Sequence, residues 1–155
     1  DFRAAGDGRV ELMASLSGVD ATVAADRLSQ GTLYLLATLA LAHAPVPPTV
    51  GCLDEADRGG HRRMLRDVRD ALYRLSYPLP ESGGREPVQV LATTHSPYLL
   101  DLFREHPEEI ILANKRGNAA TLGRLSDRAD LLELMKESNL EDLWSCGILG
   151  GVPGE

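Results

Sequence analysis

The sequence predicts an α/β fold in which a mainly parallel sheet is flanked by helices, with a β-hairpin near the C-terminus. Short apolar runs alternate along the chain with segments of helical periodicity, and most connections between them are short. This alternation is typical of parallel strands that are joined by helices. The 155 residues are expected to form one domain, residues 1–155.

The N-terminal third is predicted to contain a strand, a short helix and a long apolar helix. Residues 9–14 alternate in polarity after a turn at residues 6–8, which favours a strand, and residues 19–27 fit a short helix. Residues 30–44 are apolar nearly all round, so we expect this helix to be buried on most sides. Pro45 and the prolines after it end the helix.

Two strands and an amphipathic helix are predicted for the middle of the chain. Residues 49–53 form an apolar run between prolines and acidic residues, as in a buried parallel strand. Residues 60–76 place apolar side chains at helical spacing and arginines on the opposite face. Residues 88–93 form the clearest strand, and Ser96, followed by a proline, is suited to begin the next helix.

The C-terminal third is predicted to be built from short elements. The helix that begins after Ser96 is expected to run to Glu105. Residues 110–114 and 121–125 are two apolar strands joined by a polar turn, which predicts the hairpin. Two short helices are expected after it, at residues 131–137 and 140–144.

Composition narrows the classes of function. The formal charge of −7 argues against a chain that acts as a whole as a nucleic-acid clamp. The arginines of the helix at residues 60–76 are interpreted as a solvated surface, with a binding face as the alternative. Two cysteines without metal-binding spacing indicate a reducing, cytoplasmic compartment. No apolar run is long enough to span a membrane, and because the first residue is not methionine we expect a piece of a longer protein.

Asp54 and Glu55 end the strand predicted at residues 49–53. In parallel α/β sheets, ligands bind beyond the carboxyl ends of the strands. The first acid of such a pair can hold Mg²⁺, and the second can orient or deprotonate an attacking water. An acidic turn with no chemical role is the alternative on these two residues alone.

His95 ends the strand at residues 88–93 in the same way, among hydroxyl residues. A neutral imidazole at this position can form a hydrogen bond with a phosphate oxygen or with the attacking water. A lone histidine at a strand end is more often structural, but its neighbourhood beside Asp54 and Glu55 favours a function. A magnesium- and phosphate-dependent reaction is therefore one hypothesis for this edge of the sheet.

A small polar turn opens the apolar helix at residues 30–44. Ser29 and Thr32 have hydroxyl groups suited to cap a helix, and Gly31 leaves room for another backbone or a ligand. The first N–H groups of a helix have no partner within it and carry partial positive charge. Ser29, Gln30, Gly31 and Thr32 are therefore a candidate anion-binding turn.

These three segments together resemble the motifs of ABC-type ATPases. Residues 28–32, Leu-Ser-Gln-Gly-Thr, resemble the signature motif, and Asp54-Glu55 resembles the end of the Walker B strand. Residues 93–97, Thr-Thr-His-Ser-Pro, resemble the switch-histidine loop. The order and intervals are similar to those of the SMC-like and OLD-like branch, which is described as AAA-type or predicted ATP-binding proteins. The resemblance extends over residues 9–150.

The resemblance implies a shared site between two protomers. In such ATPases two protomers pack head to tail around two ATP molecules, and the signature turn of one contacts the γ-phosphate held by the other. Ser29, Gln30, Gly31 and Thr32 would then act in trans. Asp54 would serve Mg²⁺, Glu55 would position or activate water, and His95 would sense the γ-phosphate. The implied fold is the C-terminal part of a P-loop NTPase of the ABC type.

The family's phosphate-binding Walker A loop precedes the signature, and the pattern Gly-x-x-x-x-Gly-Lys-Ser/Thr is absent from this sequence. The chain thus resembles the C-terminal half of an ATPase domain, and alone we expect it to bind ATP poorly and to be inactive. The expected partners are an N-terminal half that carries the Walker A loop and a second protomer, as a homodimer or another head-to-tail pair. DNA is a further expected partner through the parent protein.

Other interpretations stay open. A non-catalytic interaction module on the same fold is favoured by Ala56 and Arg58, which depart from the family pattern, and by the lack of a Walker A loop. Residues 54–57 spell Asp-Glu-Ala-Asp, as in DEAD-box helicases, but the helicase Ser-Ala-Thr turn is replaced by Thr-Thr-His-Ser-Pro. A role beside a nuclease is a third alternative, since OLD-like ATPases often carry a nuclease domain.

Overall fold

The computed structural model describes residues 2–4, 10–15, 22–79 and 85–150. The predicted turn at residues 6–8 lies outside these residues. The chain divides into two compact units, one formed by the described parts of residues 1–50 and 58–89, the other by those of residues 51–57 and 90–155. No helix in the part of the chain that the structure describes is long and apolar enough to cross a membrane.

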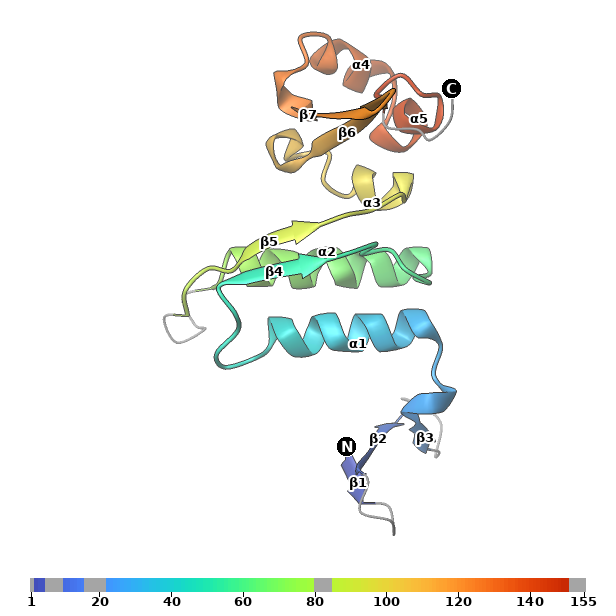
Figure 1. Cartoon of the computed structure of the whole chain (residues 1–155), viewed down its shortest axis with the longest axis vertical. Coiled ribbons are helices and arrows are strands. Elements are labelled where there is room, and N and C mark those ends of the chain that lie inside the picture. The colour runs from blue at the N-terminus through green and yellow to red at the C-terminus, as the bar shows by residue number, and fades with distance from the viewer. Residues whose placement is uncertain (1, 5–9, 16–21, 80–84, 151–155) are drawn as a thin grey trace. The chain divides into compact units, whose positions relative to one another are not determined.

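The first unit begins with a three-stranded antiparallel sheet (Figure 1). Its strands are β1 (Phe2–Ala4), β2 (Val10–Ser15) and β3 (Thr22–Ala24), in that order. The strand predicted at residues 9–14 is confirmed as β2. The helix predicted at residues 19–27 is wrong at residues 22–24, which form β3 and pair with β2, and only a 3₁₀ helix, η1 (Ala25–Arg27), follows. Residues 22–24 form a strand because pairing with β2 decides their conformation, which the weak local helical pattern does not contain.

Helix α1 (Gln30–Ala42) follows and confirms the predicted apolar helix. Its burial was predicted wrongly. Of its residues only Gly31, Thr38 and Ala42 are buried, and Leu36 is 38% exposed. In Figure 1, α1 lies beside α2, so this neighbour covers one side of the helix and leaves other apolar side chains partly accessible. The hydroxyl of the buried Thr38 donates a hydrogen bond to the carbonyl of Tyr34 at 2.9 Å, so this polar group is buried with a partner.

Helix α2 (Arg62–Ser76) confirms the predicted amphipathic helix. Its N-cap is His61, whose Nδ1 accepts the N–H of Arg63 at 3.4 Å. The apolar face is buried, and its residues recur at the spacing expected for one side of a helix. These buried residues are Leu65, Val68, Ala71, Leu72 and Leu75.

Strands β4 (Val50–Leu53) and β5 (Gln89–Ala92) form a two-stranded sheet. The two arrows run in the same direction in Figure 1. The N–H of Gln89 donates to Thr49 O and the N–H of Thr93 donates to Leu53 O, both at 2.9 Å, and the two bonds join residues of equal separation in sequence, as in a parallel pair. The parallel arrangement is therefore confirmed for this pair, whereas the other described strands are antiparallel. The expected full burial of β4 is wrong, because its residues alternate between exposed and buried.

The second unit continues from β5 into α3 (Pro97–Asp101), which begins as predicted but ends before Glu105. A 3₁₀ turn, η3 (Pro107–Glu109), then leads to the predicted hairpin, β6 (Ile111–Arg116) with β7 (Ala119–Arg124). After a further 3₁₀ turn, η4 (Leu125–Asp127), come α4 (Leu131–Glu137) and α5 (Leu140–Ser145), both as predicted.

One hydrophobic cluster holds the second unit together. Its six buried members come from the end of η3, from η4, α4 and α5, and from the segment that follows α5. The members are Ile110, Leu125, Leu131, Leu140, Leu143 and Leu149. Asp101 at the end of α3 adds a polar link, because its Oδ1 accepts the N–H of Leu140 at 2.9 Å and so caps α5 together with Asn139.

Candidate functional site

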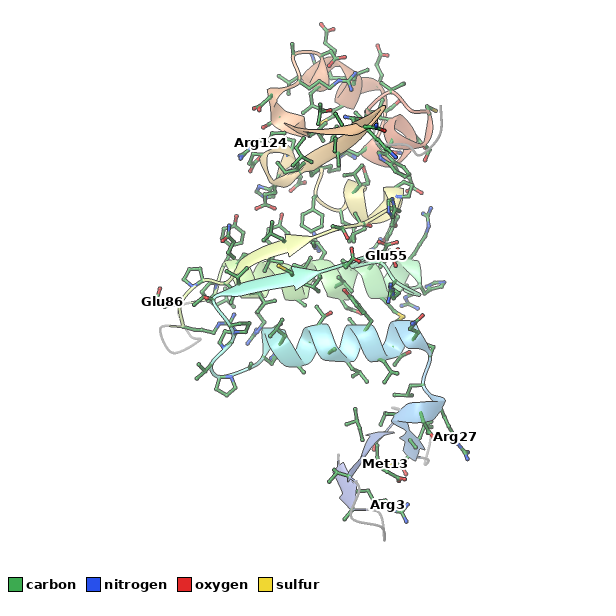
Figure 2. All side chains as sticks on the ribbon, viewed as in Figure 1. Arg3, Met13, Arg27, Glu55, Glu86 and Arg124 are labelled. Carbon is green, nitrogen blue, oxygen red and sulfur yellow. The ribbon has the colours of Figure 1, made fainter. Side chains whose placement is uncertain are left out.

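The carboxyl ends of β4 and β5 carry the polar groups that the sequence singles out. Asp54 and Glu55 follow β4 directly, and Thr93 and Thr94 follow β5. Because the strands are parallel, both ends meet at one edge, as expected for a ligand site in an α/β sheet. Figure 2 shows the Glu55 side chain at this end of β4. The structure thus brings the acidic pair to the loop that carries His95.

Thr93 links the two strand ends through both its side chain and its main chain. Its hydroxyl donates to Asp54 Oδ1 at 2.7 Å and accepts the N–H of Glu55 at 2.8 Å. Its main chain continues the pairing, since its N–H donates to Leu53 O and its carbonyl accepts the N–H of Ala56 at 2.8 Å. One residue therefore fixes the whole turn from Leu53 to Ala56.

The backbone of Glu55 has an unusual conformation. Its φ is +51°, and among the described residues no other non-glycine residue has a positive φ. The left-handed conformation costs an L-residue roughly 1–2 kcal/mol. Such strain is kept where the surrounding structure enforces it, and it is common at functional sites. Here the bond from the Glu55 N–H to Thr93 contributes to that enforcement.

A second pair of residues fixes the loop around His95. The Thr94 hydroxyl donates to Asp57 Oδ1 at 2.6 Å and accepts the N–H of Ser96 at 2.9 Å. Ser96 in turn caps α3, because its Oγ accepts the N–H of Leu99 at 3.2 Å. His95 lies between these two anchored residues and its side chain is exposed. The imidazole is therefore accessible on a loop whose two neighbours are fixed.

The turn at residues 29–32 belongs to the first unit and forms a group of its own. Ser29 is the N-cap of α1, and its Oγ accepts the N–H of Thr32 at 3.1 Å and lies 2.7 Å from the Thr32 hydroxyl. Ser29 and Gln30 are exposed, whereas Gly31 is buried. The room that Gly31 leaves is taken by the backbone of Gly59: a Cβ on Gly31 would lie 2.5 Å from its carbonyl carbon. Ser29 and Gln30 are therefore the residues of this turn that a ligand can reach most easily.

The comparison with protein families decides the class of the domain. Residues 13–101, more than half of the chain, match the family described as AAA domain, putative AbiEii toxin, Type IV TA system. The chain belongs to this family. The matched range contains the turn at residues 29–32, Asp54, Glu55 and His95. Neither a search of curated proteins nor a search of solved structures found a match to the chain.

The chain is therefore an AAA-type, ATPase-like domain. Within the residues that the structure describes, no three His, Cys, Asp or Glu side chains are grouped to hold a metal ion. Asp54, at the end of β4, is exposed.

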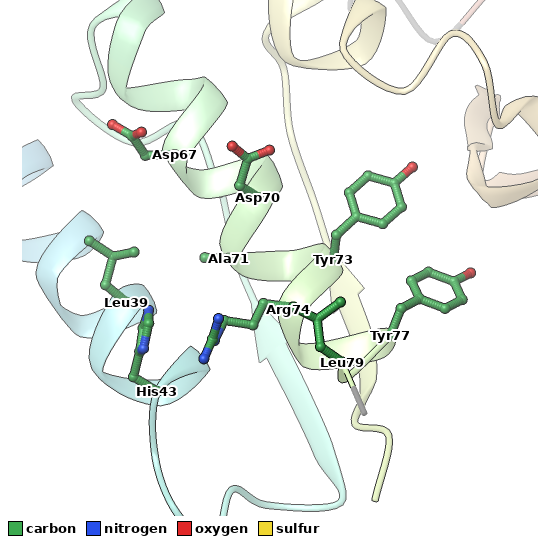
Figure 3. A pocket seen from close by; sticks show the side chains of 9 residues that line it. All are labelled: Leu39, His43, Asp67, Asp70, Ala71, Tyr73, Arg74, Tyr77 and Leu79. Atoms are coloured by element: carbon green, nitrogen blue, oxygen red, sulfur yellow. The ribbon is translucent and has the colours of Figure 1, made fainter. Parts of the chain in front are cut away.

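A hollow elsewhere in the first unit of this AAA-type domain is not a good phosphate site. It has a volume of about 460 Å³ and lies between the C-terminal ends of α1 and α2 (Figure 3). Arg74 and His43 line it, but so do Asp67 and Asp70. Two carboxylates oppose the binding of a polyphosphate, whose charge requires a net positive lining.

The sequence did not predict three structural contributions to these segments. Thr93 and Thr94 were noted only as neighbours of His95, although each binds a carboxylate of the turn after β4. The available signal was a pair of hydroxyl residues at the end of a strand adjacent to an acidic strand end. The third contribution is the close approach of Gly59 to Gly31, which hydrophobic periodicity does not indicate.

Proposed function

We propose that this AAA-type domain supplies part of an ATP-hydrolysing site of the ABC type, of the SMC-like or OLD-like branch. The observation that carries the proposal is the turn of Asp54 and Glu55 at the end of a parallel strand, bound through Thr93 to the strand that leads into the His95 loop. Hydrolysis of ATP uses residues that hold Mg²⁺, activate water and contact the γ-phosphate, and in α/β sheets ligands bind at this edge.

Each residue has a defined part in this proposal. The Asp54 carboxylate would hold Mg²⁺, which, when bound with ATP, neutralises charge on the phosphate oxygens. Glu55 would accept a proton from, or orient, the water that attacks the γ-phosphate. His95, exposed on its anchored loop, would donate a hydrogen bond to a γ-phosphate oxygen. The proposal therefore assigns acid–base work to Glu55 and charge recognition to Asp54 and His95.

The turn at residues 29–32 is proposed to act on ATP held by another protomer. The start of α1 offers N–H groups and partial positive charge to an anion. Because Gly31 is buried against Gly59, the exposed Ser29 and Gln30 would make the direct contacts, and Thr32 would orient Ser29. The partner in this arrangement is a second protomer in head-to-tail orientation.

A Walker A loop must come from another segment, because the sequence has none. The exposed side chains of Val50 on β4 (47%) and Leu91 on β5 (56%) are consistent with further elements that pack on this pair. In α/β proteins, parallel sheets are covered on both faces. We propose that a segment with a Walker A loop provides that cover.

The same exposed apolar side chains support a second candidate function, a non-catalytic interaction module on the same fold. The two candidates differ in whether a phosphate-binding loop exists. The test is to read the complete gene and to measure binding of Mg·ATP to the complete protein by calorimetry, beside the 155-residue chain alone.

The proposal predicts a Gly-x-x-x-x-Gly-Lys-Ser/Thr loop in the complete protein or in a stable partner. It also predicts ATP binding that weakens when Asp54 is replaced by asparagine, and weak binding by the isolated chain. A complete protein with no such loop and no ATP binding would establish the interaction module instead.

A further inference from the structure

We propose that Thr93 is a positioning residue for ATP hydrolysis, because its hydroxyl sets the geometry of both Asp54 and Glu55. This inference rests on the proposed function. It gives a role to Thr93, the first residue of the segment at 93–97, to which the roles proposed for Asp54, Glu55 and His95 assign none. Its basis is the set of hydrogen bonds between the two strand ends.

The side chain of Thr93 does something that its main chain does not. Strand pairing is already completed by the Thr93 N–H and carbonyl, which bond to Leu53 and Ala56. The hydroxyl is therefore not needed for the ladder. It reaches instead the two functional residues between them, the Asp54 carboxylate at 2.7 Å and the Glu55 amide at 2.8 Å.

The two bonds require a hydroxyl group at this position. A hydroxyl has one proton to donate and lone pairs with which to accept, so it can serve an acceptor and a donor at once. An ionised carboxylate only accepts, and a backbone N–H only donates. Valine has nearly the shape of threonine but can make neither bond, whereas serine can make both.

The consequence for Asp54 concerns the direction of its carboxylate. A hydrogen bond from Thr93 to Oδ1 restricts rotation of the carboxylate about its terminal torsion, which is otherwise broad. Partners of this kind, which orient a metal-binding carboxylate, typically contribute 10- to 100-fold to metal affinity or activity. Thr93 thus defines how Asp54 is presented to Mg²⁺.

The consequence for Glu55 concerns its backbone. The residue has a φ of +51°, and its N–H is anchored on the Thr93 hydroxyl. Loss of this anchor removes one restraint on the amide and lets the turn relax toward conformations that L-residues prefer. The Glu55 side chain would then leave the direction in which the turn holds it. Water activation depends on that direction, since a general base must lie within hydrogen-bond reach of its proton.

The experiment compares the wild type with Thr93→Val, Thr93→Ser and the control Thr121→Val. Thr121 is an exposed threonine of β7 whose hydroxyl makes only a long 3.4 Å bond to the Asn114 carbonyl among the bonds described. Amide hydrogen exchange is measured by NMR in the 155-residue chain, without nucleotide. ATP hydrolysis is measured in the complete protein.

In the chain, Thr93→Val should make the Glu55 amide exchange roughly tenfold faster, the factor that corresponds to one net hydrogen bond. The Ala56 amide should stay protected, because its acceptor is the backbone carbonyl of residue 93. In the complete protein, kcat should fall about 10- to 100-fold with little change in KM. Thr93→Ser should retain the wild-type values in both assays, and so should Thr121→Val.

The outcomes separate this inference from the proposed function. A complete wild-type protein that does not hydrolyse ATP contradicts the proposed function and the role of Thr93 with it. An active wild type with an equally active Thr93→Val contradicts the role of Thr93 alone. If Thr93→Ser, which keeps the hydroxyl, is as impaired as Thr93→Val, the two hydrogen bonds do not account for the effect, and the role is packing rather than positioning.

Discussion

Replacing Gly31 by alanine places a methyl group against the backbone that follows the acidic turn. The added Cβ would lie 2.5 Å from the carbonyl carbon of Gly59 and 3.1 Å from the N of Gly60, and it would be closer still to the Gly59 carbonyl oxygen. These are backbone atoms, so they cannot move aside as a flexible side chain does. Gly59 itself has a φ of +61°, which limits how the loop can adjust.

Overpacking of this kind destabilises by about 1–3 kcal/mol, which for a chain of this size lowers the melting temperature by roughly 2–12 °C. The assay is thermal unfolding followed by far-UV circular dichroism, to which α1 and α2 contribute most of the helix. Gly123→Ala is the matched control, because a Cβ there meets no atom within 4 Å. The reasoning is refuted if Gly31→Ala melts at the same temperature as Gly123→Ala.

Three further predictions concern stability. Ser29→Ala should lose the cap of α1 and destabilise the chain by about 1 kcal/mol in urea unfolding, and a loss no larger than that of an exposed surface change would contradict the cap. Leu125→Ala should lower the free energy of unfolding by about 2–5 kcal/mol, because Leu125 is fully buried in the second unit. Urea unfolding followed by the fluorescence of the single tryptophan measures this loss, and a loss below about 1 kcal/mol would contradict the packing. The Arg128 guanidinium donates a hydrogen bond to Asp130 at 2.6 Å and lowers the pKa of that carboxyl. The stability that this pair adds is therefore present above the ordinary aspartate pKa of about 3.9, and it is lost as the pH falls through the lower folded-state pKa. Asp130→Asn should therefore reduce the acid dependence of the urea midpoint below pH 5, and an unchanged dependence would exclude this pair as its source.

The local patterns of the sequence predicted most of the elements. A long apolar run ended by prolines located α1, helical spacing of apolar residues located α2, and the bounds of α4 were predicted to the residue. These elements depend on periodicity, capping residues and prolines, which are all local. The short β3 was predicted as helix because its conformation depends on pairing with β2 rather than on its own residues.

The sequence predicted which residues meet at the candidate site, but it did not predict the hydrogen bonds between them. The strand-end rule placed Asp54 and Glu55 beside the His95 loop, and the parallel pair confirms that neighbourhood. The role of Thr93 depends on a contact 39 positions away in sequence, and the burial of Gly31 depends on Gly59. Such contacts follow from the tertiary fold, and neither hydrophobic periodicity nor turn chemistry contains them. The exposure of α1 was missed for the same reason, because an apolar helix does not specify how many neighbours cover it.

The central claim is that Glu55 activates water for ATP hydrolysis. The measurement is steady-state ATP turnover of the complete protein, wild type against Glu55→Gln, with nucleotide binding and oligomeric state measured in parallel. Glutamine keeps the shape and the backbone but cannot accept the proton. The account predicts that Glu55→Gln abolishes turnover yet still binds ATP and forms an ATP-stabilised dimer. Hydrolysis at the wild-type rate by Glu55→Gln would contradict the assignment of Glu55.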